Sequence, residues 1–296
     1  RIGGVFLSGV GRFEQSQAIW PLPLPLDLNF NEDPAGDAVI SIEAKDPFIP
    51  TGIIGVMSQP FDWLELGLSV KLPADIRAEG KVEYDGSELD LPDSYLKKDG
   101  VTLSQKFPFV VRAGARYVHR RFDVEADFVW EQWSSLDAFE VDMDAVLFDG
   151  TYSDLPMPDA EVPKRFRDTY SIRYGGDVEV WPEHLAVRVG GFYQTSAYPE
   201  DNETFNLDFP FGEQIGVGGG VTWHAIIRGL NYLDVHAGYM HVFQPDVVVK
   251  RGVVQQQGMP MTIGGEEVQV SNAVNGGRYR VSLNVFGLAL EGHFPL

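Results

Sequence analysis

The fold class is decided by the segment FDVEADFVWE, residues Phe122–Glu131. Apolar side chains occupy every even position, and the odd positions are acidic apart from Val129. Because successive side chains of a strand point to opposite faces, the segment has one apolar and one charged face. Such a strand fits a wall between an apolar medium and a polar interior. A soluble sandwich would show the same alternation, so strand length must separate the two.

The alternation recurs along the chain in long segments. We predict ten strands, at about Ile2–Glu14, Asp37–Gln59, Trp63–Tyr84, Phe107–His119, Arg121–Val141, Arg165–Val180, Leu185–Ser196, Gln214–Ile226, Asn231–Phe243 and Arg278–His293. Strands of soluble sandwiches usually have about five or six residues, whereas about 9–11 cross a bilayer. The lengths therefore favour membrane-spanning strands.

The connections alternate between short and long. Short turns lie at 60–62, 119–121, 181–183 and 227–229, and long polar links lie at 16–36, 85–106, 142–164, 197–213 and 244–277. Outer-membrane barrels have short turns on the periplasmic side and long loops outside. We therefore predict an all-β, transmembrane antiparallel β-barrel that forms a single domain over residues 1–296.

The same alternation predicts which side chains face lipid. The expected outward rows are Leu64, Leu66, Leu68 and Val70; Phe109, Val111, Ala113, Ala115 and Tyr117; Leu185, Val187, Val189, Gly191 and Tyr193; Leu233, Val235, Ala237 and Tyr239; and Tyr279, Val281, Leu283 and Val285. The residues between them are expected to face the interior.

Composition excludes several classes of function. The 296-residue chain has a formal charge of −20 and no cysteine. Nucleic-acid binding needs a basic surface, and thiol catalysis and zinc knuckles need cysteine. No apolar run approaches the roughly 18 residues of a transmembrane helix, but a barrel needs none.

Catalytic and metal-binding motifs are also missing from the sequence. We find no GxSxG, HExxH or phosphate-loop pattern, and we expect neither an enzyme nor a cofactor. His236 and His241 are five residues apart and would face opposite sides of a strand, so we expect no metal site. The acidic stretch 137–159 is interpreted as a solvated outer loop, with loose Ca²⁺ or lipopolysaccharide bridging as the alternative.

The charged faces predict ion pairs inside the barrel. Arg116 should lie across from, or diagonal to, Asp123 or Glu125, and Arg188 should lie opposite Asp177. Arg173 shares this face. One interpretation is a charge ladder that stabilises the wall. The other is that an unpaired arginine among Arg116, Arg173 and Arg188 binds the anionic head of a ligand.

Three glycines share one face of the predicted strand Gln214–Ile226. Gly216, Gly218 and Gly220 leave that face without side chains. Glycine in a strand marks a close approach of a ligand or another backbone, or a bend in the wall. Both interpretations stay open at this stage.

Several segments resemble the FadL/TodX family of outer-membrane transporters of long-chain fatty acids and aromatic hydrocarbons. They are FVVRAGARYVHRRFDVEADFVWEQWSSLDAFEV (109–141), FRDTYSIRYGGDVEVWPEHLAVRVGGFYQTSAYP (166–199), LDVHAGYMHVFQP (233–245) and NGGRYRVSLNVFGLALEGHF (275–294). The resemblance implies a barrel of roughly fourteen strands, plugged by an N-terminal hatch. The chain then supplies the C-terminal portion, about ten strands, and the hatch and about the first four strands are expected upstream.

The family captures its ligand in an apolar groove of the outer loops, and the first long loop here is AIWPLPLPLDLNF (18–30). The residues expected to line the groove are Trp20, Leu22, Leu24, Leu26 and Phe30, with Tyr95 and Leu96 from the next long loop as its other lip. An exposed apolar patch of this size indicates an interaction site.

The predicted function is passive transport of hydrophobic small molecules, either fatty acids or aromatic hydrocarbons, across the bacterial outer membrane. The expected surroundings are outer-membrane lipid and lipopolysaccharide, and the expected state is a monomer. The alternatives are a general porin or structural barrel, and a soluble all-β binding domain.

Overall fold

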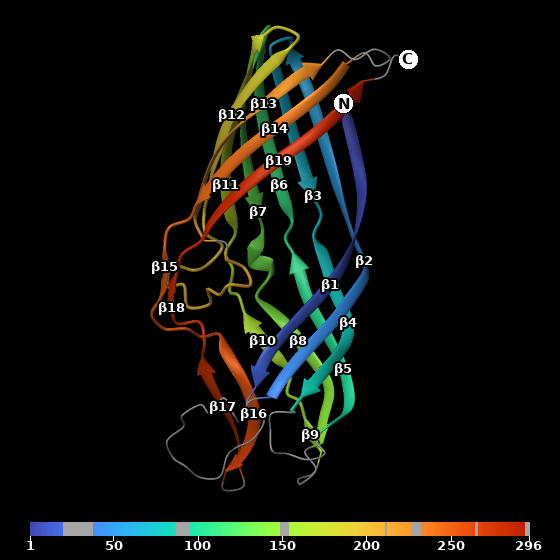
Figure 1. Ribbon diagram of the computed structural model, residues 1–296, viewed down its shortest axis with the longest axis vertical. Helices are drawn as coiled ribbons and strands as arrows, with labels where there is room; N and C mark the ends of the chain where they lie inside the picture. The colour runs from blue at the N-terminus through green and yellow to red at the C-terminus, as the bar shows by residue number, and fades with distance from the viewer. Residues whose placement is uncertain are drawn as a thin grey trace.

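The computed structural model describes residues 1–19, 38–86, 95–148, 154–210, 212–225, 232–263 and 266–293. Its main feature is a curved antiparallel wall (Figure 1). In order of pairing, the wall strands are β1 (Ile2–Ile19), β2 (Ala38–Phe61), β3 (Leu64–Lys71), β6 (Val110–His119), β7 (Phe122–Glu131), β11 (Thr169–Trp181), β12 (Leu185–Gln194), β13 (Gln214–Ala225), β14 (Tyr232–Phe243) and β19 (Ser282–His293). Each predicted strand contributes one of them, so the predicted wall is confirmed.

Part of the sheet continues beyond the wall as an extension. It contains β4 (Ala74–Asp85), β5 (Tyr95–Phe107), β8 (Ala138–Phe148), β9 (Leu155–Pro156) and β10 (Ala160–Pro163), and the long β2 carries β3 and β4 on the same side. Alanine and branched aliphatic residues of β2, β4, β5 and β8 pack into a core of its own, which includes Ile40, Val82 and Leu103.

The extension corrects three predicted boundaries. The predicted strand 63–84 is interrupted between β3 and β4 at Pro73, which has no N–H to donate. The predicted link 85–106 is wrong over most of its length, because β5 begins at Tyr95. Its sequence KKDG breaks the alternation that identified the other strands. The 3₁₀ turn η2 (Trp133–Ser135) divides the predicted strand 121–141 into β7 and β8.

The long connections hold further strands. β15 (Val247–Val249) pairs with β18 (Gly277–Tyr279), and β16 (Gln255–Ile263) pairs with β17 (Glu266–Ala273). At the base of these connections, aromatic and aliphatic side chains form a loop core of Leu136, Phe166, Ala197, Tyr198, Phe205 and Val249. Among the described residues, no helix has the length and apolarity to cross a membrane.

Strand register decides which faces look outward. The rows expected on β3, β6, β12 and β14 lie on one common face, as Leu64↔Tyr117 and Leu185↔Trp223 show. The row expected on β19 is wrong. Val285 pairs with Met240 on the inner face, and Phe286 pairs with outward Tyr239. Both faces of VSLNVFGLALEG are apolar, so alternation alone could not choose between them.

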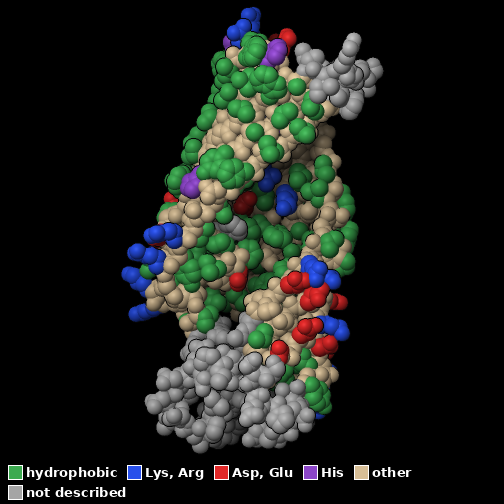
Figure 2. Space-filling model, in the orientation of Figure 1, with side chains coloured by type: hydrophobic (Ala, Val, Ile, Leu, Met, Phe, Trp, Pro, Cys, Tyr) green, Lys and Arg blue, Asp and Glu red, His purple; other side chains and the backbone are tan. Residues whose placement is uncertain are grey.

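The described wall curves around a hollow and does not close on itself. In the part of the chain that the structure describes, β1 pairs only with β2, and β19 pairs only with β14. Figure 2 looks into the hollow, where acidic and basic side chains are visible inside the wall. The inner face is therefore the candidate surface for a ligand site.

Candidate functional site

The inner face is divided into a charged half and an apolar half. Strands β3, β6, β7 and β11 carry the charged side chains Glu65, Arg116, Asp123, Glu125, Asp127, Arg173 and Asp177. Away from their short-turn ends, strands β13, β14 and β19 contribute mostly Gly, Val, Met and Ala to the same face, and β12 forms the boundary. This segregation distinguishes the lumen from a uniformly polar channel.

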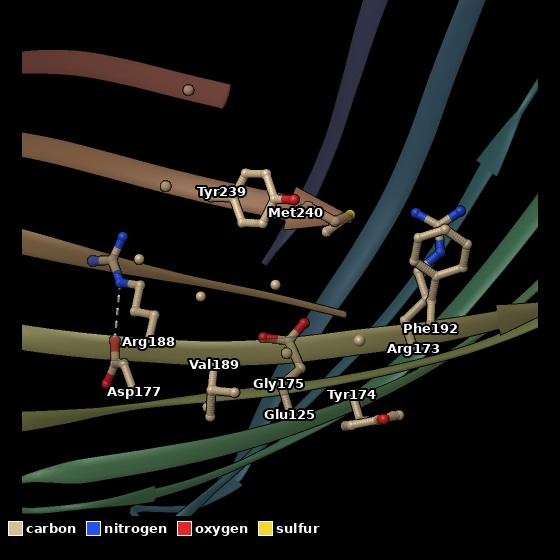
Figure 3. A pocket seen from close by; sticks show the side chains of 18 of the residues that line it. Glu125, Arg173, Tyr174, Gly175, Asp177, Arg188, Val189, Phe192, Tyr239 and Met240 are labelled. Carbon is tan, nitrogen blue, oxygen red and sulfur yellow. Dashed lines mark ion pairs between the residues drawn. The ribbon is translucent and has the colours of Figure 1, made fainter. Parts of the chain in front are cut away.

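Two of the inner arginines are held by carboxylates. Arg116 pairs with Asp123, and its guanidinium lies 3.4 Å from Glu65. Arg188 lies 3.6 Å from Asp177 (Figure 3). The predicted pairs across β6–β7 and β11–β12 are confirmed. Here the charge-ladder interpretation holds, because each guanidinium links neighbouring strands.

Two other inner arginines make no ion pair within the described residues. Arg173 points to the ring of Phe192, with its guanidinium carbon 5.9 Å from the ring centroid (Figure 3), and its Nε lies 3.4 Å from the hydroxyl of Ser171. Arg112, on β6, is the second arginine without an ion pair in the described part of the chain. The sequence analysis named Arg173 but not Arg112 as a candidate site residue. Whether an arginine has a carboxylate partner depends on side-chain geometry, which the sequence does not give. These two guanidinium groups are available to an anion.

Glycine residues line the apolar half of the inner face. Gly175, Gly190 and Gly218 lie opposite one another across three strands, and Gly220, Gly238 and Gly287 form a second row beside them. A β-carbon at Gly218 or Gly220 would lie 2.8 Å from a carbonyl oxygen of β14. Since β13 keeps its register on both sides, the glycines do not mark a bulge. They make a smooth inner surface on closely spaced strands.

Cavities border both halves. One of about 940 Å³ is lined by the two glycine rows, Phe192 and Met240, with Arg173 and Arg188 at its charged side (Figure 3). A second, of about 780 Å³, includes Arg112, Arg116 and Arg173 in its lining. Gly216 lies outside the lining of the larger cavity, and the ring of Phe192 covers it. The structure thus brings Arg116, Arg173, Arg188, Gly218 and Gly220, which the sequence analysis named separately, to the lining of one cavity.

The expected capture groove is not assembled from described residues. Trp20, Leu22, Leu24, Leu26 and Phe30 lie outside the described residues. Tyr95 and Leu96 belong to β5, not to a loop, where they pair with Phe148 and Leu147. Leu96 packs against the core of the extension, while Tyr95 is 51% exposed.

The acidic stretch 137–159 is described at 137–148 and 154–159, and these parts are not the single solvated loop that was expected. Residues 138–148 form β8. The carboxylate of Asp144 lies 3.0 Å from Nζ of Lys98, and Asp159 accepts a hydrogen bond from the Met143 amide. These acidic groups therefore bind neighbouring strands and loops.

The loop core holds a buried cation at the base of the long connections. Lys164 is 1% exposed, and its Nζ lies 3.3 Å from Oδ1 of Asn206 and 5.1 Å from the ring centroid of Phe209. Burial lowers the pKa of the Lys164 amine, and burial raises the pKa of the Tyr198 phenol, which donates to the Phe209 carbonyl. Both side chains join segments of the long connections, at a place outside the lumen.

Comparison with solved structures gives the fold. The structure matches a Pseudomonas aeruginosa FadL homologue with a TM-score of 0.65 at 15% identity, over 98% of this chain and 63% of that one. The toluene transporters TbuX of Ralstonia pickettii and TodX of P. putida match with TM-scores of 0.48, at 14% and 13% identity. The matches cover 82% and 88% of this chain, and 57% and 54% of theirs. The chain thus spans less than two thirds of the length of each.

Comparison with family models shows the family to which the chain belongs. No curated protein matches the chain. Residues 28–285 match the family model described as outer membrane protein transport protein (OMPP1/FadL/TodX), which is most of the sequence. The fold, the alternating wall and the short turns agree with that description. The chain belongs to the FadL/TodX family of outer-membrane transport proteins.

Proposed function

We propose that this protein is a passive importer of hydrophobic small molecules that carry an anionic end, with long-chain fatty acids as the substrate class. The observation behind the proposal is the divided inner face. Its glycine-lined apolar half meets its charged half at Phe192 and Arg173. An acyl chain would lie on the apolar half, where burial contributes about 25 cal/mol per Å². A carboxylate would bind the arginines that make no ion pair among the described residues.

A general porin is the second candidate. A water-filled pore is lined by polar groups, and the charged half of the inner face suits that role. The glycines, Met240 and Val285 of the other half do not. A steady open conductance in planar bilayers would favour the porin over the transporter.

The role of the apolar half is tested by Gly287→Trp. A β-carbon at Gly287 would meet no atom within 4 Å, so a side chain can start from this position without a clash with the wall. Because the width of a pathway limits what passes, uptake of labelled oleate by cells should fall at least about tenfold. Leu288→Trp is the matched control, since Leu288 is the next residue, faces lipid and is 84% exposed. Normal uptake by Gly287→Trp, at equal surface expression, contradicts the proposal.

The anionic end is tested by Arg173→Gln. Loss of a charge-assisted hydrogen bond costs about 1.5–3 kcal/mol, which predicts a rise of about 10- to 100-fold in the Kd for oleate. The Kd for toluene, which has no charge, should not change. Titration of the detergent-solubilised protein with both ligands measures the two constants. Equal weakening for oleate and toluene would show that Arg173 supports the wall and not the ligand.

A further inference from the structure

A second group of side chains lies on the inner face, near the short-turn ends of β13, β14 and β19. Asp234 lies directly opposite Glu291, and His236 is two residues further along β14, so all three point into the lumen. One ligand atom from each lies within 4.8 Å of the others. Nε2 of His236 is 3.8 Å from Oε2 of Glu291. Nothing in the proposed path of a fatty acid requires this group.

Neighbouring side chains orient the three. The hydroxyl of Thr222, which is 1% exposed, lies 2.9 Å from Nδ1 of His236 and leaves Nε2 directed at the carboxylates. Nδ1 of His224 lies 2.6 Å from Oδ1 of Asp234. A hydrogen bond at one ring nitrogen, with the other directed at carboxylates, is the arrangement that supports metal-bound histidines in proteins.

We propose that Asp234, His236 and Glu291 bind a divalent transition-metal ion of the zinc or nickel type. One imidazole and two carboxylates form a nitrogen and oxygen donor set that suits these ions, whereas Ca²⁺ prefers oxygen ligands alone. Ligands at about 2.1 Å from a tetrahedral zinc lie about 3.4 Å apart, so a small contraction of the group suffices. Three protein ligands leave one position of a tetrahedral ion to water.

The bound ion would join β14 to β19 at the inner surface. Residues Asp234 and Glu291 are far apart in the sequence, and only the register of the two strands brings them together. His241 lies on β14 too, but it pairs with outward Val217 and belongs to the other face. The expectation of no metal site did not consider Asp234 and Glu291 beside His236; the placement of His236 and His241 on opposite faces is confirmed.

Calorimetric titration of the full-length protein with Zn²⁺, in detergent and after removal of metals by a chelator, tests the site. One tight site per chain is expected. His236→Ala should weaken it at least about 100-fold, and Thr222→Val should weaken it about tenfold through loss of orientation. His241→Ala is the matched control and should bind as the wild type does.

Two outcomes overturn the proposal. One is the absence of saturable binding by the wild type at millimolar Zn²⁺. The other is equal binding by the wild type and His236→Ala, which would place the ion on other acidic groups of the surface. If His236→Ala does not fold, Glu291→Gln gives the same comparison, because Glu291 lies on the last wall strand and its side chain is 61% exposed.

Discussion

Replacement of Arg116 by methionine is expected to lower the free energy of unfolding by about 3 kcal/mol, because it leaves poorly solvated carboxylates without a counter-charge. Arg116 pairs with Asp123 and Glu65, whose side chains are 15% and 21% exposed. Glu125 lies directly opposite it across β6–β7. Methionine keeps most of the volume of the side chain, so packing changes little. Urea unfolding of the protein refolded into lipid vesicles measures the loss.

Two further variants show whether charge is the cause. Arg120→Met removes an exposed arginine from the adjacent turn and should change stability by less than about 0.5 kcal/mol. Asp123→Asn added to Arg116→Met should restore part of the lost stability, since it removes one unpaired charge. If Arg116→Met is as stable as Arg120→Met, the ladder of inner charges does not support the wall.

The sequence predicted most of the wall because lipid on one face and charge on the other impose a strict period of two. Phe122–Glu131 and its neighbours obey that period, and the charged pairs followed from the turn between β6 and β7. The period fails where both faces meet similar surroundings. On β19 both faces are apolar, and on β5 the segment KKDG interrupts the pattern. Both errors have this one physical origin.

The candidate site was predictable only in part, since a single strand shows the face of a residue but not its partners. Arg173 and Gly218 were assigned to the lumen from alternation alone. The continuity of the glycine rows depends on the register of β11 to β19. The same holds for Asp234 and Glu291, which meet through the pairing of β14 with β19. Long connections separate β12 from β13 and β14 from β19 in the sequence, so no local pattern reports the register of these two pairs.

The second large effect is expected in the loop core, at Asn275. This side chain is 3% exposed and joins three segments. Its amide donates to the carbonyls of Glu203 and Phe205 at 2.7 and 2.8 Å, and its Oδ1 accepts from the Val254 amide at 3.1 Å. Asn275→Ala would leave the Phe205 carbonyl and the Val254 amide without their partner at a site that water reaches poorly, while the Glu203 carbonyl keeps its bond from the Val253 amide. Each such group costs about 1–3 kcal/mol, so we expect a local loss of about 3 kcal/mol.

Hydrogen exchange followed by mass spectrometry locates this loss. Protection of the peptides that contain Phe205 and Val254 should fall about 100-fold, while β12 and β13 keep theirs, because local opening does not require the wall to unfold. Glu200→Ala is the control in the same loop. Its side chain is 93% exposed and its ion pair with Arg167 is solvated, so protection should not change. Uniform loss of protection across the wall in Asn275→Ala would mean that the loop core and the barrel unfold as one unit. Asn275 would then stabilise the wall strands as well as the loop core.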